Sequence, residues 1–154
     1  ERAREICLAA LERRRHSRRE LELLLRRKGL GDEVAAPLLD RLEETGLLDD
    51  EEFARAFVDS RQRSRPRGRR GLTAELRQRG VSAEIIDRVL GDVEEEEDPV
   101  EAARRAVASR LRGHAGRLPA EARRKAEQFL LRRGFDYDTI RRALAELAPP
   151  DPED

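Results

Sequence analysis

Residues 23–30, LLLRRKGL, decide how this sequence is divided, because the pattern returns as AELRQRGV at 74–81 and FLLRRGF at 129–135. Each copy ends in basic residues followed by a glycine, which suits the C-terminus of a helix closed by a left-handed residue. The three glycines, Gly29, Gly80 and Gly134, stand 51 and 54 residues apart. A recurring unit of this size predicts a repeat protein.

Apolar residues at fixed distances from each glycine support the repeat. They stand eight and four residues before it, and one, ten and thirteen residues after it: Leu21, Leu72 and Ala126; Leu25, Leu76 and Leu130; Leu30, Val81 and Phe135; Leu39, Leu90 and Leu144; Leu42, Val93 and Leu147. Together with capping signals such as Ser17 and Asp136, this spacing predicts three helices in every copy. The expected ranges are 2–14, 17–28, 32–45, 50–63, 69–79, 82–91, 99–112, 119–133 and 137–147.

The predicted fold class is all-α, with tandem three-helix repeats, three units and nine helices, in an elongated curved array. Aromatic residues make up only 3% of the chain, so the core must be built mainly from aliphatic side chains. The expected domains are repeat 1 at 1–48, repeat 2 at 49–96, repeat 3 at 97–148, and a disordered tail at 149–154. A unit of about 50 residues buries little surface alone, so neighbouring repeats are expected to share contacts.

The composition gives no sign of catalytic chemistry. His16, His114 and the single cysteine, Cys7, lack the spacing of a metal site, and Cys7 lies in an apolar helical stripe that predicts a buried thiol. No apolar run approaches the length of a membrane span. We therefore expect a cytoplasmic protein that is not an enzyme, with no catalytic residues, no metal and no cofactor.

Charge is segregated along a chain whose formal net charge is zero. Residues 53–80 carry nine arginines against Asp59 and Glu75, and RSRPRGRR at 63–70 is predicted to connect two helices. Compensation of helix dipoles explains part of this pattern, but not a basic connection. The candidate contacts to a partner or to DNA are Arg61, Arg63, Arg65, Arg67, Arg69, Arg70, Arg18, Arg19, Arg26 and Arg27.

Three stretches carry a resemblance to a known family. GLLDDEEFARAFVDSR at 46–61, followed by ELRQRGVS at 75–82, resembles the signature of the RecX regulatory proteins, which are bacterial modulators of the RecA recombinase. AALERRRHSRREL at 9–21 is similar to the family's opening motif. One departure is GRRG at 68–71, where the family commonly has Gly-Pro-Arg-Arg. Gly71 near a helix start is expected to cost about 1 kcal/mol relative to alanine.

The resemblance implies tandem three-helix repeats and a role in regulating recombination and DNA repair. The implied partner is the RecA filament, whose ATPase, strand exchange and co-protease activities would be restrained, with single- or double-stranded DNA as a further partner and a monomeric state. Two alternatives stay open at this point. One is a sequence-independent DNA-binding repeat protein, and the other is a helical scaffold with an unrelated protein partner.

Overall fold

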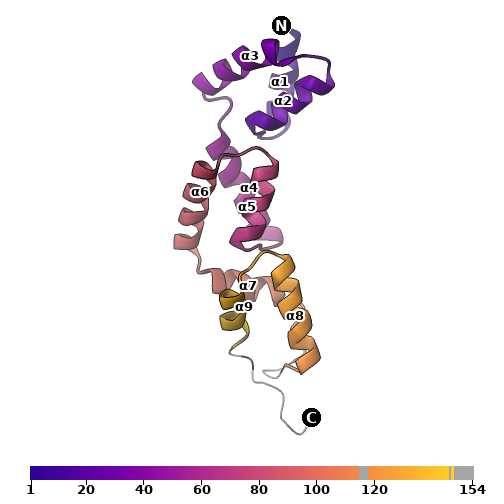
Figure 1. Cartoon of the computed structure of the whole chain (residues 1–154), viewed down its shortest axis with the longest axis vertical. Coiled ribbons are helices and arrows are strands. Elements are labelled where there is room, and N and C mark those ends of the chain that lie inside the picture. The colour runs from indigo at the N-terminus through magenta and orange to yellow at the C-terminus, as the bar shows by residue number, and fades with distance from the viewer. Residues whose placement is uncertain (115–117, 146, 148–154) are drawn as a thin grey trace. The chain divides into compact units, whose positions relative to one another are not determined.

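The computed structural model describes residues 1–114, 118–145 and 147. This part of the chain forms nine α-helices and no strand (Figure 1). The helices are α1 Arg2–Arg13, α2 Arg18–Arg27, α3 Asp32–Glu44, α4 Asp50–Ser64, α5 Arg69–Gln78, α6 Ala83–Glu96, α7 Pro99–Val107, α8 Ala120–Arg132 and α9 Tyr137–Leu144. The all-α prediction and its three helices per copy are confirmed. The tail predicted at 149–154 lies outside the described residues.

Two helices differ most in length from the sequence prediction. Helix α6 continues to Glu96 rather than ending near 91, because the glutamates after Asp92 are good helix formers and extend the turn pattern. Helix α7 ends at Val107 rather than near 112. Beyond it the backbone tightens: the Arg110 N–H donates to the Val107 carbonyl at 2.9 Å, a bond that spans three residues rather than four.

The repeated glycines close the second helix of each copy in the same way. Gly29, Gly80 and Gly134 have φ of 82°, 81° and 88°, a conformation that residues with a Cβ rarely adopt. The N–H of the residue after each glycine donates to the carbonyl five positions earlier, at 2.9–3.1 Å, which is the Schellman arrangement. The apolar residue four positions before each glycine has no exposed surface. The motif that reveals the repeat in the sequence is therefore a helix stop anchored in the core.

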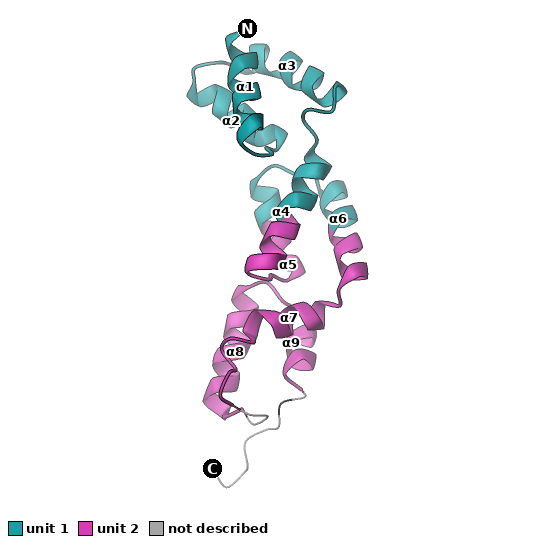
Figure 2. Cartoon of the chain, turned by 180° about the vertical axis from the view of Figure 1, so that it is seen from behind, with its two compact units in different colours: residues 1–57, 75–89 teal, residues 58–74, 90–154 magenta. Residues whose placement is uncertain are grey.

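By its contacts the chain divides into two compact units, and each is described separately (Figure 2). Unit 1 comprises residues 1–57 and 75–89, and unit 2 comprises residues 58–74 and 90–154. In unit 1, helices α1, α2 and α3 enclose a core built from small and aliphatic side chains. Its buried members are Ala3, Cys7, Leu21, Leu25, Ala35, Leu39, Leu42 and Leu48. The prediction of a buried Cys7 thiol is confirmed, and burial raises the pKa of this group.

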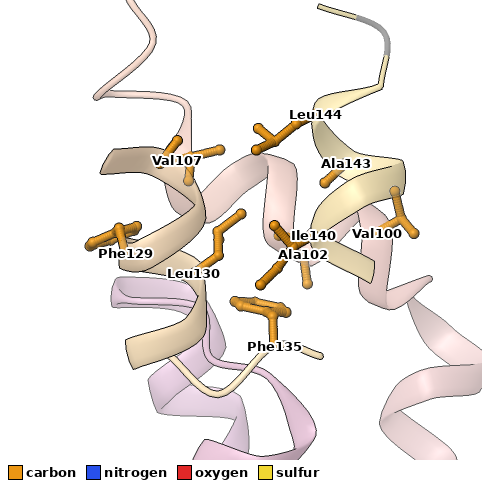
Figure 3. Close-up of a cluster of buried hydrophobic side chains, with 11 residues drawn as sticks. Val100, Ala102, Val107, Phe129, Leu130, Phe135, Ile140, Ala143 and Leu144 are labelled. Atoms are coloured by element: carbon orange, nitrogen blue, oxygen red, sulfur yellow. The ribbon is translucent and has the colours of Figure 1, made fainter. Parts of the chain in front are cut away.

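The main core of unit 2 lies between α7, α8 and α9. Figure 3 shows Leu130, Phe135 and Ile140 pointing toward one another, with Phe129 at the edge of the cluster. Phe135 is the residue after the glycine stop, so the turn itself supplies the largest ring to the centre. The other buried members are Val100, Ala102, Ala103, Val107, Ala126, Ala143 and Leu144.

Unit 1 also contains a head-to-tail contact between two second helices, which we call the first junction. The side chain of Ser17, at the start of α2, is fully buried and donates to the Arg79 carbonyl, at the end of α5, at 2.6 Å. The same hydroxyl accepts the Glu20 N–H, and the Glu20 carboxylate accepts the Ser17 N–H, forming a capping box. A Cβ at Gly80 would lie 2.2 Å from the Cβ of Arg19. The positive start of one helix thus meets the negative end of another.

Unit 2 repeats this contact at the equivalent positions, and we call it the second junction. The Gly68 N–H, at the start of α5, donates to the Arg133 carbonyl at 2.8 Å, and the Arg70 N–H donates to the Gly134 carbonyl at 3.3 Å. The second junction is thus a contact between two backbones, whereas the first uses a side chain. A Cβ at Gly68 would lie 2.4 Å from the Gly134 carbonyl oxygen, and one at Gly71 would lie 2.7 Å from the Arg133 carbonyl oxygen.

The second junction explains why GRRG stands at 68–71. Glycine at the start of α5 costs helix propensity, but a side chain at Gly68 or Gly71 would collide with the end of α8. The expectation that Gly71 only lowers helix stability is therefore incomplete, because the packing requires a glycine there. Arg69, which stands where the family commonly has proline, pairs with Glu94 at 2.9 Å.

Candidate functional site

The basic stretch at 63–70 is a connection inside the fold, as predicted, but it is shorter than the sequence suggested. Helix α4, expected at 50–63, continues to Ser64, so Arg61 and Arg63 lie on a helix as that range predicts. The connection proper is residues 65–68, with Pro66 buried within it. The Arg67 N–H donates to the Gln62 side-chain oxygen at 2.9 Å, which fixes the chain as it enters α5.

The six candidate arginines of unit 2 fall into different environments. Arg63 pairs with Asp59 at 2.9 Å and Arg69 pairs with Glu94, so both charges are partly balanced within the protein. Arg61 and Arg67 are half-buried and interact with other groups. Arg65 and Arg70 are exposed and have no ion-pair partner in the part of the chain that the structure describes. These two are the better candidates for an external anion.

The four candidates of unit 1 are mostly engaged in ion pairs. Arg18 bridges Asp40 at 2.7 Å and Glu43 at 3.1 Å. Partial burial acts to lower the pKa of Arg18, but these two acids outweigh it and raise the pKa, which marks the group as a structural cation. The remaining pairs are Arg19 with Glu22 and Arg26 with Asp32.

Arg27 differs from its neighbours in unit 1. Among residues 1–114, 118–145 and 147, it has no ion-pair partner, and its side chain is exposed. The structure therefore gives the ten candidates different environments within their own units. It leaves three of them, Arg27, Arg65 and Arg70, without an internal counter-charge.

The structure adds arginines that sequence reasoning missed, around Phe129 of α8. The Cζ of Arg110 lies 4.1 Å from the Phe129 ring centroid, and the Cζ of Arg133 lies 4.8 Å from it. A guanidinium over an aromatic ring is held in place by the ring's quadrupole. Phe129 is itself only 7% exposed, so the ring supports the two cations rather than offering a surface of its own.

The pKa of Arg133 reflects its partial burial and the positive charges that surround it. Partial burial lowers the pKa of Arg133, and the next strongest influences are all positive charges, from Arg67, Arg65, Arg110 and Arg132. The connection at 65–68 and the end of α8 thus bring their guanidiniums together, as the backbone bonds of the second junction require. We call Arg65, Arg67, Arg110, Arg132 and Arg133 the arginine cluster.

Compensation of the α8 dipole accounts poorly for this cluster. Basic residues at a helix C-terminus normally balance its unpaired carbonyls. Here the Arg133 and Gly134 carbonyls already accept N–H groups from α5. The positive charge at this end of α8 is therefore in excess.

One signal in the sequence could have located part of the cluster. Arg132 stands two residues before its glycine in FLLRRGF, as the candidate Arg27 does in LLLRRKGL, so the repeat pointed to it. Arg133 corresponds to Lys28, which was not a candidate. Arg110 carries no such signal, because only the fold brings it over Phe129.

A small pocket in unit 2 is a poorer candidate for anion binding. Its floor is apolar, from Leu72, Leu90 and Phe135. Two of its lining carboxylates are paired, Glu94 with Arg69 at 2.9 Å and Glu97 with Arg105 at 2.7 Å. Asp136 also lines the pocket, so three carboxylates oppose the binding of an anion there.

Two further classes of site are absent from the described residues. Within them, no three side chains of histidine, cysteine, aspartate or glutamate come together as a metal site would require. The helices that the structure describes also include none with the length and apolar character needed to cross a membrane.

Comparison with known proteins agrees with the repeat and its order. Three family models match in sequence: RecX, first three-helix domain, at 3–42; RecX, second three-helix domain, at 49–90; and RecX, third three-helix domain, at 96–144. The regulatory protein RecX of Halorhodospira halophila is 42% identical over 147 residues, covering 94% of this chain and 88% of that protein. The regulatory protein RecX of Mycolicibacterium smegmatis is 37% identical over 156 residues, covering 94% and 81%.

The fold of the chain is also similar to that of a solved structure. The crystal structure of RecX from Lactobacillus salivarius superposes with a TM-score of 0.81 at 20% identity, covering 95% of this chain and 94% of that one. At this identity the likeness establishes the fold alone, whereas the two sequence relatives and the three domain models establish descent. The chain is therefore a member of the RecX family of regulatory proteins.

Proposed function

We propose that this protein binds the RecA recombinase and its DNA filament and restrains its ATPase, strand exchange and co-protease activities. The observation that carries the proposal is the match of all three RecX domain models, in order, from residue 3 to residue 144. A protein that retains every domain of a regulatory family, in the family's order, is expected to retain its regulatory partner.

The repeated structure gives this proposal a physical basis. A filament presents the same subunit surface again and again, and a chain of similar units can contact it at several points. Each contact can be weak, because binding at one unit raises the effective concentration of the others at their own sites. The exposed arginines without an internal counter-charge, Arg27, Arg65 and Arg70, are suited to carboxylates or phosphates on such a target.

The test is the single-stranded-DNA-dependent ATPase of RecA, measured against increasing concentrations of this protein. We expect the steady-state rate to fall with added protein and to saturate. In the same assay, the double variant Arg65→Ser, Arg70→Ser should need a higher concentration to reach half of the maximal inhibition. An ATPase rate that stays constant at every concentration of the wild-type protein would reject the function.

A second function, direct sequence-independent binding to a nucleic-acid strand, is favoured by one specific observation. The arginine cluster concentrates positive charge in unit 2 although the whole chain has no net charge. Binding of this kind depends strongly on salt, since each neutralised phosphate releases counterions. Equal affinity for unrelated sequences would be expected.

A further inference from the structure

Apart from Arg65, which the proposed contact to the filament also uses, the members of the arginine cluster have no role in the regulatory function, and the cluster has a definable chemistry. Its geometry is fixed by three separate restraints. Phe129 supports the guanidiniums of Arg110 and Arg133, and the Gly68 N–H ties the connection at 65–68 to the end of α8 at 2.8 Å. Arg110 and Arg133, held in this way, lose little side-chain entropy when they bind an anion.

We propose that Arg65, Arg67, Arg110, Arg132 and Arg133 of unit 2 form one site for consecutive phosphates of a single nucleic-acid strand, with Phe129 as the platform that orients Arg110 and Arg133. The site rests on the second function proposed above, strand binding, and gives that function a location. Guanidinium groups suit phosphate because their planar donors match its oxygens and they are weakly hydrated.

The surroundings of the cluster favour a phosphate backbone over an acidic protein. Protein interfaces usually have an apolar or aromatic centre within a polar rim, whereas nucleic-acid interfaces are more polar and strongly positive. Phe129 is covered by its two cations and is 7% exposed. In the described part of unit 2, the exposed large apolar side chains are Leu131 and Tyr137.

Neither of these exposed side chains supplies a centre for a protein contact at the cluster. Leu131 is two residues from both Phe129 and Arg133 on α8, and side chains two apart on a helix do not share a face. Tyr137 begins α9 rather than belonging to the elements that carry the cluster. The cluster is therefore a charged surface without an apolar anchor.

The experiment measures binding of a fluorescent oligothymidine to the full-length protein over a series of salt concentrations. The test variant is Arg65→Gln, Arg110→Gln, Arg132→Gln, which changes exposed side chains and leaves the half-buried Arg133 in place. The matched control is Arg124→Gln, Arg141→Gln, Arg142→Gln, which removes the same charge from exposed positions elsewhere in unit 2. Circular dichroism of both variants checks that the helices are intact.

We expect the test variant to bind about tenfold or more weakly at low salt, and its plot of log K against log salt to lose about two units of slope, since each contact to a single strand contributes about 0.7. The control should keep a clearly larger slope.

If the two variants lose equal affinity and slope, the site is wrong and general charge accounts for binding. If the wild-type protein does not bind the oligonucleotide, strand binding itself fails. If polyglutamate competes as well as the oligonucleotide, the site belongs to an acidic protein instead.

Discussion

Ser17 is a single residue on which two helices depend. Its hydroxyl accepts the Glu20 N–H at the start of α2 and donates to the Arg79 carbonyl at the end of α5, and it is fully buried. Removing the hydroxyl leaves the partly buried Glu20 N–H and Arg79 carbonyl without this partner, and both losses cost free energy away from water.

We expect Ser17→Ala to lower the free energy of unfolding by about 1–2 kcal/mol. Ser82→Ala is the matched control, because Ser82 is exposed and caps α6 through a single weak bond, from the Ile85 N–H at 3.4 Å. Urea denaturation of the two variants measures the difference. Equal losses would show that the contact to Arg79 contributes nothing.

Glu20 links the first junction to pH. Partial burial acts to raise the pKa of this carboxyl group, but hydrogen bonds from Arg14 and from the Ser17 N–H, with the charges of Arg14 and Arg79, outweigh it and hold the pKa below 4.5. A group whose pKa is depressed by folding stabilises the protein above its unfolded pKa. That contribution is lost as the pH falls below 4.5 through the folded value.

As the pH falls below the ordinary pKa of a glutamate, the free energy of unfolding of the wild-type protein should therefore fall more steeply than that of Glu20→Gln. At neutral pH the variant should be the less stable protein. Chemical denaturation at several pH values, with both proteins in the same buffers, gives the two curves. Parallel curves would mean that this carboxylate does not contribute to acid sensitivity.

At the scale of elements, the start of α5 shows packing overriding helix propensity. Alanine is the better helix former at any interior position, so Gly71→Ala should strengthen α5 considered alone. In the fold, the added Cβ would lie 2.7 Å from the Arg133 carbonyl oxygen. Both groups belong to backbones that are tied together, so neither can move away cheaply.

We expect Gly71→Ala to destabilise the protein, whereas Gly91→Ala in α6 should stabilise it by about 0.5–1 kcal/mol, since a Cβ there has nothing within 4 Å. Thermal or urea denaturation of both variants gives the sign of each change in the free energy of unfolding. If both substitutions stabilise, the close approach of α5 and α8 is not maintained in solution.

The same elements show what the sequence could predict and what it could not. The helix ends at Gly29, Gly80 and Gly134 were predictable, because a glycine after basic residues is a local signal for a left-handed helix cap. The junctions were not, because Ser17 and Arg79 are far apart in sequence and only packing brings them together. The candidate site was predicted in part: Arg65 and Arg67 belong to the cluster, but Arg110 joins it through a contact that no local pattern reveals.

At the scale of the whole molecule, the repeat borders and the contact borders do not coincide. The sequence predicts repeats at 1–48, 49–96 and 97–148, and these limits stay a prediction, as does their elongated, curved array. The contacts instead divide the middle repeat between units 1 and 2. The first and third repeats therefore each pack with a different part of the middle one.

A comparison of fragments tests this dependence. Residues 1–90 contain all of unit 1, including the first junction, whereas residues 1–48 hold α1, α2 and α3 without Arg79 and Gly80. We expect the longer fragment to unfold cooperatively and the shorter one to be only partly helical, as followed by circular dichroism against urea. A cooperative transition in the shorter fragment would show that the first repeat is self-sufficient.

The first junction also sets an order of events during translation. The hydroxyl of Ser17 cannot reach its acceptor until Arg79 has been synthesised and has left the ribosome. In the same way, the glycine-lined start of α5 waits for Arg133. Each nascent repeat thus stays incomplete until most of the next one has emerged, and a stalled chain exposes an unfinished helix start to chaperones and proteases.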